Sequence, residues 1–162
     1  MLAKVFEVKA PIFTFRQWHR HRTQSYNEQS ARYSILSEEF YVPELDQITM
    51  QHTDNKQMRT NEINPYALSI QEIIRSSNQR AFKNYHAMLN LNCPRELART
   101  VLPVGTYSKM FATCNLRSLM HFHELRSHPH AQAEIQAYSY AMLQLIEPIV
   151  PVATEAFKEI IK

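Results

Sequence analysis

The sequence contains a single glycine, Gly105, in 162 residues. Dinucleotide-binding fingerprints and phosphate-binding loops need about two or three glycines, because their backbone must approach a pyrophosphate closely. Neither motif can therefore exist in this sequence. If a protein of this composition binds phosphate groups, it has to use side chains.

The sequence is also poor in cysteine and lacks a long apolar run. Two cysteines, Cys93 and Cys114, cannot build a disulfide framework, and charged residues at Lys4 and Glu7 leave no start that resembles a signal peptide. We therefore expect a cytoplasmic protein. Pro148 interrupts the most hydrophobic stretch well short of the ~20 residues that span a bilayer, so we expect no membrane partner.

The composition predicts one globular domain over residues 1–162. Hydrophobic residues make up 44% of the chain and aromatic residues 10%, which is enough to bury a core. Residues 8–37 hold five lysines and arginines against one acid, and residues 95–132 hold five against two. Two separate basic segments favour a discrete anionic ligand. A nucleic-acid partner is not expected, because the basic residues lack regularly interleaved aromatic residues.

The hydrophobic periodicity predicts a helix-rich α+β domain with a small sheet. Asn64-Pro65 is a helix start signal, and Asn115 is a candidate N-cap. The polar stretch 44–64 is expected to be an irregular surface excursion. Strands are predicted over 3–10 and 106–113, with extended backbone around 40–42, and helices from 11 to about 20 and over 66–91, 94–101, 116–126, 130–146 and 152–161.

Arginines are concentrated in residues 20–33, the segment most indicative of function. Arg20, Arg22 and Arg32 lie there among small polar residues, with Glu28 as the one acid. A guanidinium binds phosphate or carboxylate through paired, directional hydrogen bonds. The segment therefore predicts a site for a phosphorylated ligand.

Arg20-His21-Arg22, followed after seven residues by Ser30, resembles the signature of the flavin-dependent thymidylate synthases. The resemblance covers about residues 5–42 and 93–140. Further matching segments are residues 9–13, 16–18, 27–28, 32–34, 39–41, 98–99, 101–103, 115–120, 125–126 and 130–132.

This resemblance implies reductive methylation of dUMP to dTMP by a homotetramer whose sites are shared between subunits. FAD would be the cofactor, methylenetetrahydrofolate the methylene donor and NADPH the reductant. The implied FAD contacts are Arg20, His21, Arg22, Asn27, Glu28, Asn115, Arg117, His121 and His130. The implied nucleotide contacts are Gln17, Glu28, Ser30, Arg32, Arg99 and Arg126.

The residue types suit activation of the uracil ring by charge. A cysteine could attack C6, but neither cysteine lies in a recognisably activating setting. A permanently charged guanidinium near a ring carbonyl stabilises negative charge as it develops, and we assign that role to Arg126. Ser30 is interpreted as a substrate contact, because no base is clearly dedicated to it.

A metal site is not expected. Three His-x-His pairs, at 19/21, 121/123 and 128/130, contain the imidazoles that zinc often uses, but arginines lie among them and would repel a dication.

The sequence also departs from the family pattern. Family members usually carry some fifty residues before the first strand, including a histidine-bearing segment that helps to cover flavin and folate, and the chain resembles a short form without them. Two alternatives therefore stay open. One is a UMP or dUMP C5-methylase of a specialised nucleoside pathway, and the other is a non-catalytic nucleotide-binding form that needs a partner segment.

Overall fold

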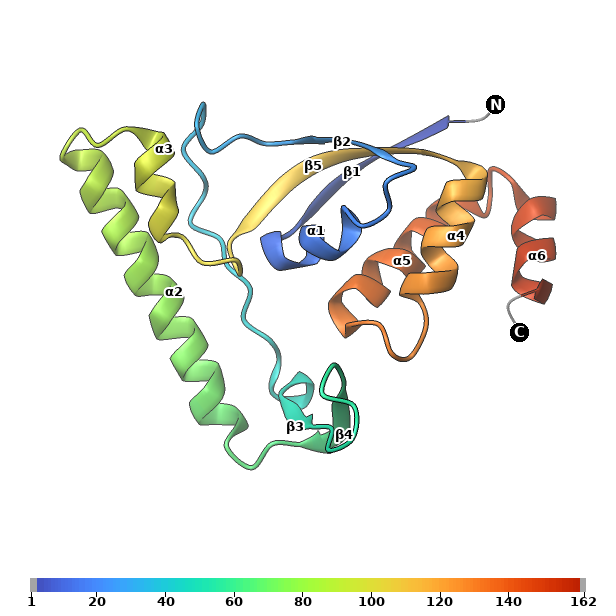
Figure 1. Ribbon diagram of the computed structural model, residues 1–162, viewed down its shortest axis with the longest axis horizontal. Helices are drawn as coiled ribbons and strands as arrows, with labels where there is room; N and C mark the ends of the chain where they lie inside the picture. The colour runs from blue at the N-terminus through green and yellow to red at the C-terminus, as the bar shows by residue number, and fades with distance from the viewer. Residues whose placement is uncertain (1–2, 161–162) are drawn as a thin grey trace. The chain divides into compact units, whose positions relative to one another are not determined.

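The computed structural model describes residues 3–160, which form helices and two small sheets (Figure 1). This mixed architecture confirms the predicted α+β class. The strands are β1 (Ala3–Pro11), β2 (Ser25–Glu28), β3 (Thr49–Gln51), β4 (Arg59–Ile63) and β5 (Tyr107–Asn115). The helices are α1 (Ile12–Trp18), α2 (Ala67–Asn90), α3 (Arg95–Ala98), α4 (Leu116–Arg126), α5 (Ala133–Ile146) and α6 (Pro151–Ile160), with short 3-10 helices η1 (Leu45–Gln47) and η2 (Arg99–Val101).

The larger sheet has three strands in the order β1-β5-β2. Side chains alternate between buried and exposed along β1 and β5, as expected when one face of a sheet covers a core. Phe6, Val8 and Ala10 point inward from β1, and Met110 and Ala112 do so from β5. Both strands were predicted, whereas the short polar strand β2 was not.

The described residues group into two compact units. Unit 1 comprises residues 3–8, 16–27 and 111–160, and unit 2 comprises residues 9–15 and 28–110. The arginine-rich segment is therefore divided, with residues 20–27 in unit 1 and residues 28–33 in unit 2. A single domain over 1–162 stays a prediction.

Trp18 lies in the core of unit 1. Its indole is fully buried, 4.8 Å from the ring of Phe122 on α4 and 6.0 Å from that of Tyr138 on α5. Leu119 and Ile135, also fully buried, add to the packing of α4 against α5. The end of α1, where the arginine-rich segment begins, is thus fixed by burial.

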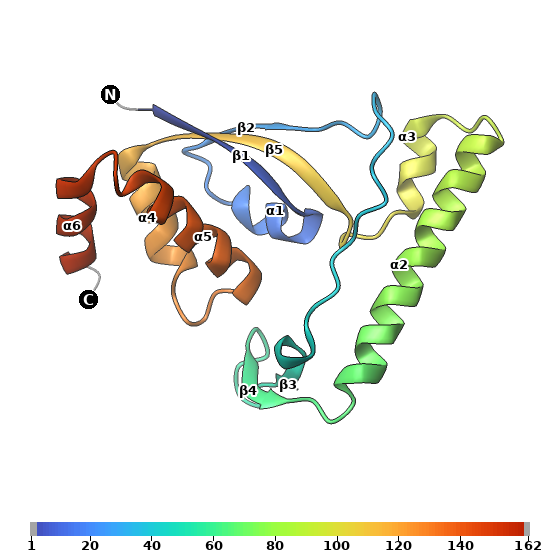
Figure 2. The same cartoon turned by 180° about the vertical axis from the view of Figure 1, so that it is seen from behind.

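The core of unit 2 lies where α2 packs against α3, and the two helices run side by side in both ribbon views (Figures 1 and 2). Phe82 and Tyr85 of α2 and Ala98 of α3 are completely buried. The Tyr85 hydroxyl also accepts a hydrogen bond from the Leu36 backbone at 3.4 Å. This packing fixes the position of α3, which directly precedes Arg99, one of the implied nucleotide contacts.

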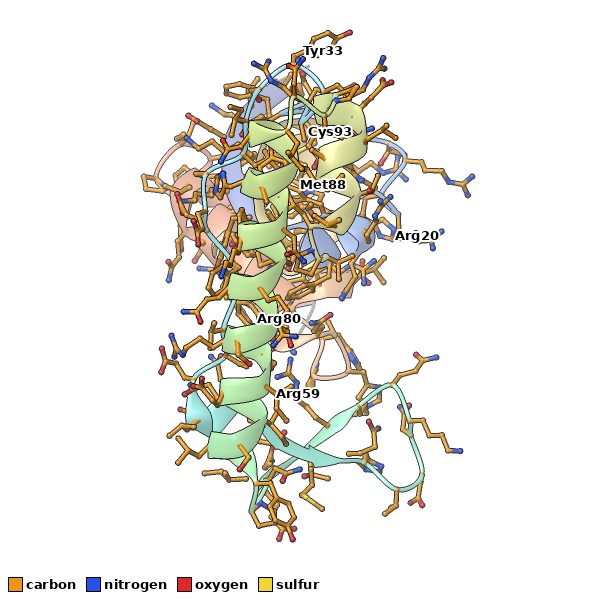
Figure 3. The ribbon with its side chains drawn as sticks, turned by 90° about the vertical axis from the view of Figure 1, so that its left-hand side faces the viewer. Arg20, Tyr33, Arg59, Arg80, Met88 and Cys93 are labelled. Atoms are coloured by element: carbon orange, nitrogen blue, oxygen red, sulfur yellow. The ribbon has the colours of Figure 1, made fainter. Side chains whose placement is uncertain are left out.

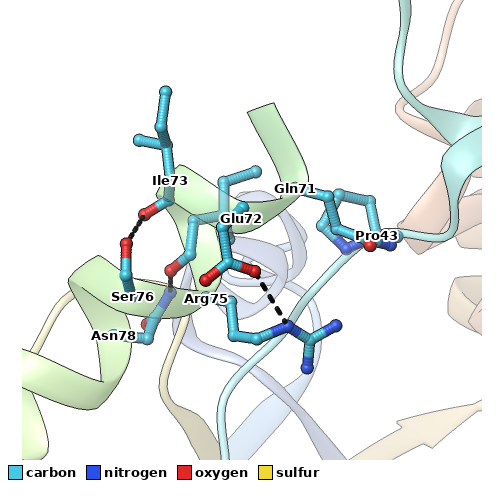
Figure 4. A network of polar contacts seen from close by, with 8 residues as sticks. Pro43, Gln71, Glu72, Ile73, Arg75, Ser76 and Asn78 are labelled. Atoms are coloured by element: carbon cyan, nitrogen blue, oxygen red, sulfur yellow. Dashed lines mark hydrogen bonds and ion pairs between the residues drawn. The ribbon is translucent and has the colours of Figure 1, made fainter. Parts of the chain in front are cut away.

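Polar contacts along α2 anchor its first half (Figure 4). Gln71 donates from Nε2 to the Pro43 carbonyl at 2.8 Å, which attaches the preceding loop to the helix. Asn78 is buried and donates to the carbonyl of Ile74 at 2.7 Å. The expected helix over 66–91 is thereby confirmed to within one residue at each end.

The prediction of an irregular excursion over 44–64 was wrong. The segment forms η1 and the antiparallel hairpin β3-β4. Polar side chains support it, because Gln51 donates to the Met58 carbonyl at 2.8 Å and Arg59 donates to the Gln47 carbonyl at 2.9 Å. Because polar residues form these strands, the sequence shows no alternation of apolar and polar residues that would predict them. Within residues 3–160 no helix has the length and apolar character needed to span a bilayer.

Candidate functional site

The residues after α1 form a turn that presents two arginines on either side of a buried histidine. His21 donates from its backbone to the Trp18 carbonyl at 3.0 Å, and the Gln24 backbone donates to the His21 carbonyl at 3.2 Å. The Trp18 indole closes the turn by donating to Oε1 of Gln24 at 3.2 Å. As a result His21 is only 7% exposed, while Arg20 and Arg22 face solvent and Arg20 projects well away from the ribbon (Figure 3).

Arg126, the last residue of α4, contacts this turn directly. Its Nε donates to Nε2 of His21 at 2.9 Å, and its Nη2 donates to the Gln17 carbonyl at 3.1 Å. These bonds use two of the five guanidinium N–H groups. Within residues 3–160 no further partner of Arg126 is present, so the remaining N–H groups can bind a ligand.

The contact with Arg126 requires a neutral imidazole, because Nε2 of His21 can accept only when the ring proton is on Nδ1. Burial, then the Arg126 guanidinium and then His121 lower the pKa of His21 from 6.5 to about 4. Burial also lowers the pKa of Arg126. Phe122 packs edge-on against the His21 ring at 4.7 Å. The pair therefore consists of one cation and one neutral acceptor at neutral pH.

Gln132 joins this cluster although it was not predicted as a site residue. The Gln17 side chain donates from Nε2 to Oε1 of Gln132, which links α1 to the residue that precedes α5. The sequence did contain one signal for Gln132, because it lies in residues 130–132, one of the segments that match the family pattern. We call the group of Gln17, His21, Arg126 and Gln132 the Arg126 cluster.

Within residues 3–160 no side-chain hydrogen bond links the other predicted residues of unit 1 to the Arg126 cluster. Asn115 caps α4 by accepting from the Ser118 backbone at 2.9 Å, so the predicted cap is confirmed. The His121 ring lies 6.4 Å from that of His21 and 3.5 Å from the Glu124 carboxylate. Exposed side chains are Arg20, Arg22, Asn27, Arg117, His121 and His130.

A second group lies in unit 2, at the turn after β2. Ser30 accepts from the Arg32 backbone through its hydroxyl at 3.3 Å, and its carbonyl accepts from the Tyr33 backbone at 3.1 Å. Nε of Arg32 lies 3.6 Å from Glu96 of α3. Arg95 donates to the Tyr33 carbonyl at 2.7 Å. Helix α3 thus holds this turn through Arg95 and Glu96, neither of which was among the predicted site residues.

Arg99 is exposed at the start of η2, directly after α3, and Glu28 is exposed at the end of β2. We call the group of Glu28, Ser30, Arg32 and Arg99 the Arg32 group. The Ser30 hydroxyl contacts backbone, which agrees with a binding role better than with an activated nucleophile.

Cys114 does not offer a thiolate in this structure. Burial raises the pKa of Cys114 to about 11, so its thiol is protonated at neutral pH. Cys93 is half-buried beside the carbonyl of Pro94. Residues 3–160 contain no cluster of three or more histidine, cysteine or acidic side chains that could hold a metal ion.

A family profile described as thymidylate synthase complementing protein matches residues 1–152. The flavin-dependent thymidylate synthase of Gluconobacter oxydans is 42% identical over 158 residues, covering 95% of this chain and 52% of the relative. The enzyme of the same name from Thermus thermophilus is 43% identical, covering 98% of this chain and 57% of the relative. The chain thus spans about half the length of the curated relatives it matches.

Solved structures extend this similarity to the fold. A UMP/dUMP methylase, PolB of Streptomyces cacaoi, bound with 5-Br UMP, matches with a TM-score of 0.90 and 37% identity, covering 97% of this chain and 73% of that chain. The same methylase bound with 5-Br dUMP matches with a TM-score of 0.88. Together with the matched profile and the identity to curated relatives, these similarities show that the chain belongs to the flavin-dependent thymidylate synthase family.

Proposed function

We propose that the protein containing this chain catalyses the reductive methylation of dUMP to dTMP. FAD would be its cofactor, methylenetetrahydrofolate its methylene donor and NADPH its reductant. The observation that carries this proposal is Arg126, held by His21 and Gln17 with several N–H groups left for a ligand. Family membership supports the reaction class.

Arg126 suits the activation of a uracil ring. Uracil C5 is a poor nucleophile until negative charge can develop on the ring and its carbonyl oxygens. A guanidinium whose orientation is already fixed stabilises such charge without reorganising during the reaction. His21 fixes Nε and the Gln17 carbonyl fixes one terminal nitrogen. Cys114 cannot provide the alternative covalent route while its thiol is protonated.

The residues of unit 1 fit a flavin dinucleotide. Arg20, Arg22 and Arg117 are exposed, and among residues 3–160 no carboxylate pairs with them, so their charges are available to a pyrophosphate. Side chains of unit 1 that can hydrogen-bond the remaining groups of FAD are His21, Asn27, Asn115, His121 and His130. Glu28, which belongs to unit 2, is a further proposed FAD contact. When bound in its reduced form, FAD would supply the reducing equivalents for the methyl group.

The Arg32 group suits the phosphate and sugar of the nucleotide. Arg32 pairs with Glu96 at the surface, where each side chain is more than half exposed, so a phosphate can displace the carboxylate at small cost. Arg99 adds a second exposed cation near α3. Ser30 and Glu28 supply polar groups, and we propose that Gln17 and Arg126 contact the base.

UMP is a second candidate acceptor, because the matched methylase structure contains 5-Br UMP. UMP and dUMP differ by one hydroxyl, and the polar Arg32 group could accept either sugar. Turnover of both nucleotides under identical conditions decides between them: equal or faster turnover of UMP would identify a UMP/dUMP methylase.

We further propose a homotetramer in which different copies contribute to one site. The test is to mix Arg126→Ala protein with Arg32→Ala protein after brief dissociation. If copies share sites, some sites in the mixed tetramers contain neither substitution, and part of the activity returns. Activity that stays as low as in either variant alone, or a monomeric mass by light scattering, would contradict the proposal.

Tritium release from dUMP labelled at C5 tests the reaction itself, with methylenetetrahydrofolate and NADPH present. We expect the purified protein to show flavin absorbance. We also expect tritium release to require dUMP, methylenetetrahydrofolate and NADPH together. Colourless protein that stays inactive with added FAD would contradict the proposal. Calorimetry that detects dUMP binding without any turnover would instead favour the non-catalytic nucleotide-binding form.

A further inference from the structure

We infer that Tyr26 positions the turn that carries Arg20 and Arg22. Its hydroxyl lies 2.8 Å from the His21 carbonyl oxygen and 3.0 Å from that of Trp18. Tyr26 belongs to β2, so these contacts tie the turn to a strand. Tyr26 was not among the predicted site residues, and this inference rests on the proposed function because it concerns FAD binding.

The two carbonyls are the points at which the turn closes. The Trp18 carbonyl also accepts from the His21 backbone, and the His21 carbonyl accepts from the Gln24 backbone. A tyrosine hydroxyl has one proton, which the two carbonyls share. Because Arg20 lies between the two carbonyls and Arg22 directly follows the second, the hydroxyl holds the backbone at the base of both arginines.

Tyr26 is well suited to act as a permanent donor. Burial and the nearby Cys114 raise its pKa to about 12, so the hydroxyl keeps its proton across the whole physiological range. The ring is half-buried and packs edge-on against His19 at 4.8 Å, which restricts its motion. A phenylalanine would keep the ring and lose only the two hydrogen bonds.

Loss of the Tyr26 hydroxyl should weaken FAD binding more than it slows turnover. Without the hydroxyl the turn samples more conformations, and the arginines must be ordered when FAD binds. A lost hydrogen bond of this kind corresponds to about three- to tenfold weaker FAD affinity. Turnover at saturating FAD should fall less than FAD affinity, because Tyr26 contacts the backbone of His21 and none of the side chains of the Arg126 cluster.

The test compares Tyr26→Phe with Tyr140→Phe in otherwise intact protein. Tyr140 is a matched control, since its hydroxyl also bonds a backbone carbonyl of unit 1, that of Ser127, at 3.3 Å. FAD affinity and turnover at saturating FAD are measured for both variants. Trp18 is the chain's one tryptophan, so its emission reports on the turn even without a ligand.

We expect Tyr26→Phe to bind FAD about three- to tenfold more weakly, with red-shifted Trp18 emission, and Tyr140→Phe to match wild type in both. In a double-mutant cycle with Arg22→Ala, the effect of Tyr26→Phe on FAD affinity should shrink. Additive effects, unchanged FAD affinity, or a variant that does not fold would each overturn the assignment.

Failure of the proposed function looks different. Wild-type protein would then bind no FAD, and the emission of Trp18 alone would decide the role of Tyr26 in holding the turn. A red shift in Tyr26→Phe, absent from Tyr140→Phe, would support that role. Identical emission in both variants would overturn it.

Discussion

Arg126 in unit 1 and Arg32 in unit 2 are both held by partners, but by partners of opposite kinds. Arg126 is half-buried and bonds a neutral imidazole and a backbone carbonyl. Arg32 is exposed and faces the carboxylate of Glu96 across 3.6 Å. Neutral acceptors orient a guanidinium without cancelling its charge, whereas a carboxylate neutralises it until a competing anion arrives.

This difference separates two tasks that arginine performs in binding sites. Stabilising charge that develops in a transition state requires a fixed cation that does not reorganise. Capturing a phosphate only requires a cation that can exchange one anion for another. The structure therefore assigns fixed geometry to the Arg126 cluster and adjustable geometry to the Arg32 group, and the following variants test that distinction.

Replacing Arg126 should have the largest effect. Arg126→Ala removes the proposed stabilising charge and leaves His21 without its donor, and we expect turnover to fall by about 10²–10³-fold, as for other preorganised donors. Tritium release from C5-labelled dUMP measures this loss. The control is Arg80→Ala, which removes an exposed arginine of α2 (Figure 3) and should leave turnover unchanged. Turnover within twofold of wild type would show that Arg126 is not the stabilising group.

The pH dependence of stability tests the neutral state of His21. Because its pKa is about 4 in the folded chain and 6.5 in the unfolded reference, the unfolded chain binds more protons between these values. The contribution to stability is therefore complete above pH 6.5 and is lost as the pH falls towards 4, by up to about 3 kcal/mol. Urea unfolding across this range measures it.

His21→Gln provides the comparison, because it retains an acceptor for Arg126 but does not titrate. Its free energy of unfolding should depend less steeply on pH between 4 and 6.5 than that of wild type. Part of the slope should persist, since burial also lowers the pKa of His123. Identical slopes in both proteins would mean that His21 is not held neutral.

Arg32→Lys should have a smaller effect. Lysine keeps the positive charge but cannot supply two parallel hydrogen bonds to a phosphate, and we expect about tenfold weaker dUMP binding with turnover at saturation preserved. Calorimetry at constant ionic strength measures the affinity. A loss of turnover without a change in affinity would reverse the roles assigned to the two arginines.

The sequence predicted the parts of this structure that local patterns determine. The helix over 66–91 follows from apolar spacing, and the cap at Asn115 follows from its position before an apolar run. The strand β2 and the hairpin β3-β4 were missed, because polar residues form them. Pairing with β5 supports β2, and side-chain bonds to backbone carbonyls support the hairpin. Local periodicity contains no signal for such elements.

The same limit applies to the candidate site. Arginine density and the family resemblance identified Arg126 and His21, but the bond between them joins residues 105 positions apart. Nothing in either segment predicts that His21 accepts from Arg126. Gln132 was missed for the same reason, since it acts through one contact with the side chain of Gln17, 115 positions away. Tyr26 was missed because its hydroxyl bonds two backbone carbonyls, those of Trp18 and His21, and such bonds depend on the fold of the turn.

Glu96→Gln should have the smallest effect and the opposite sign. The Glu96 carboxylate competes with the dUMP phosphate for Arg32 and also repels that phosphate. Neutralising Glu96 should therefore strengthen dUMP binding, by about threefold at most because the Arg32–Glu96 pair is exposed. The gain should shrink at high ionic strength, where exposed charges are screened. Affinity measured at low and high salt checks both expectations. Weaker binding in Glu96→Gln would mean that the carboxylate orients Arg32 as firmly as His21 orients Arg126, and the distinction between a fixed and an adjustable arginine would then fail.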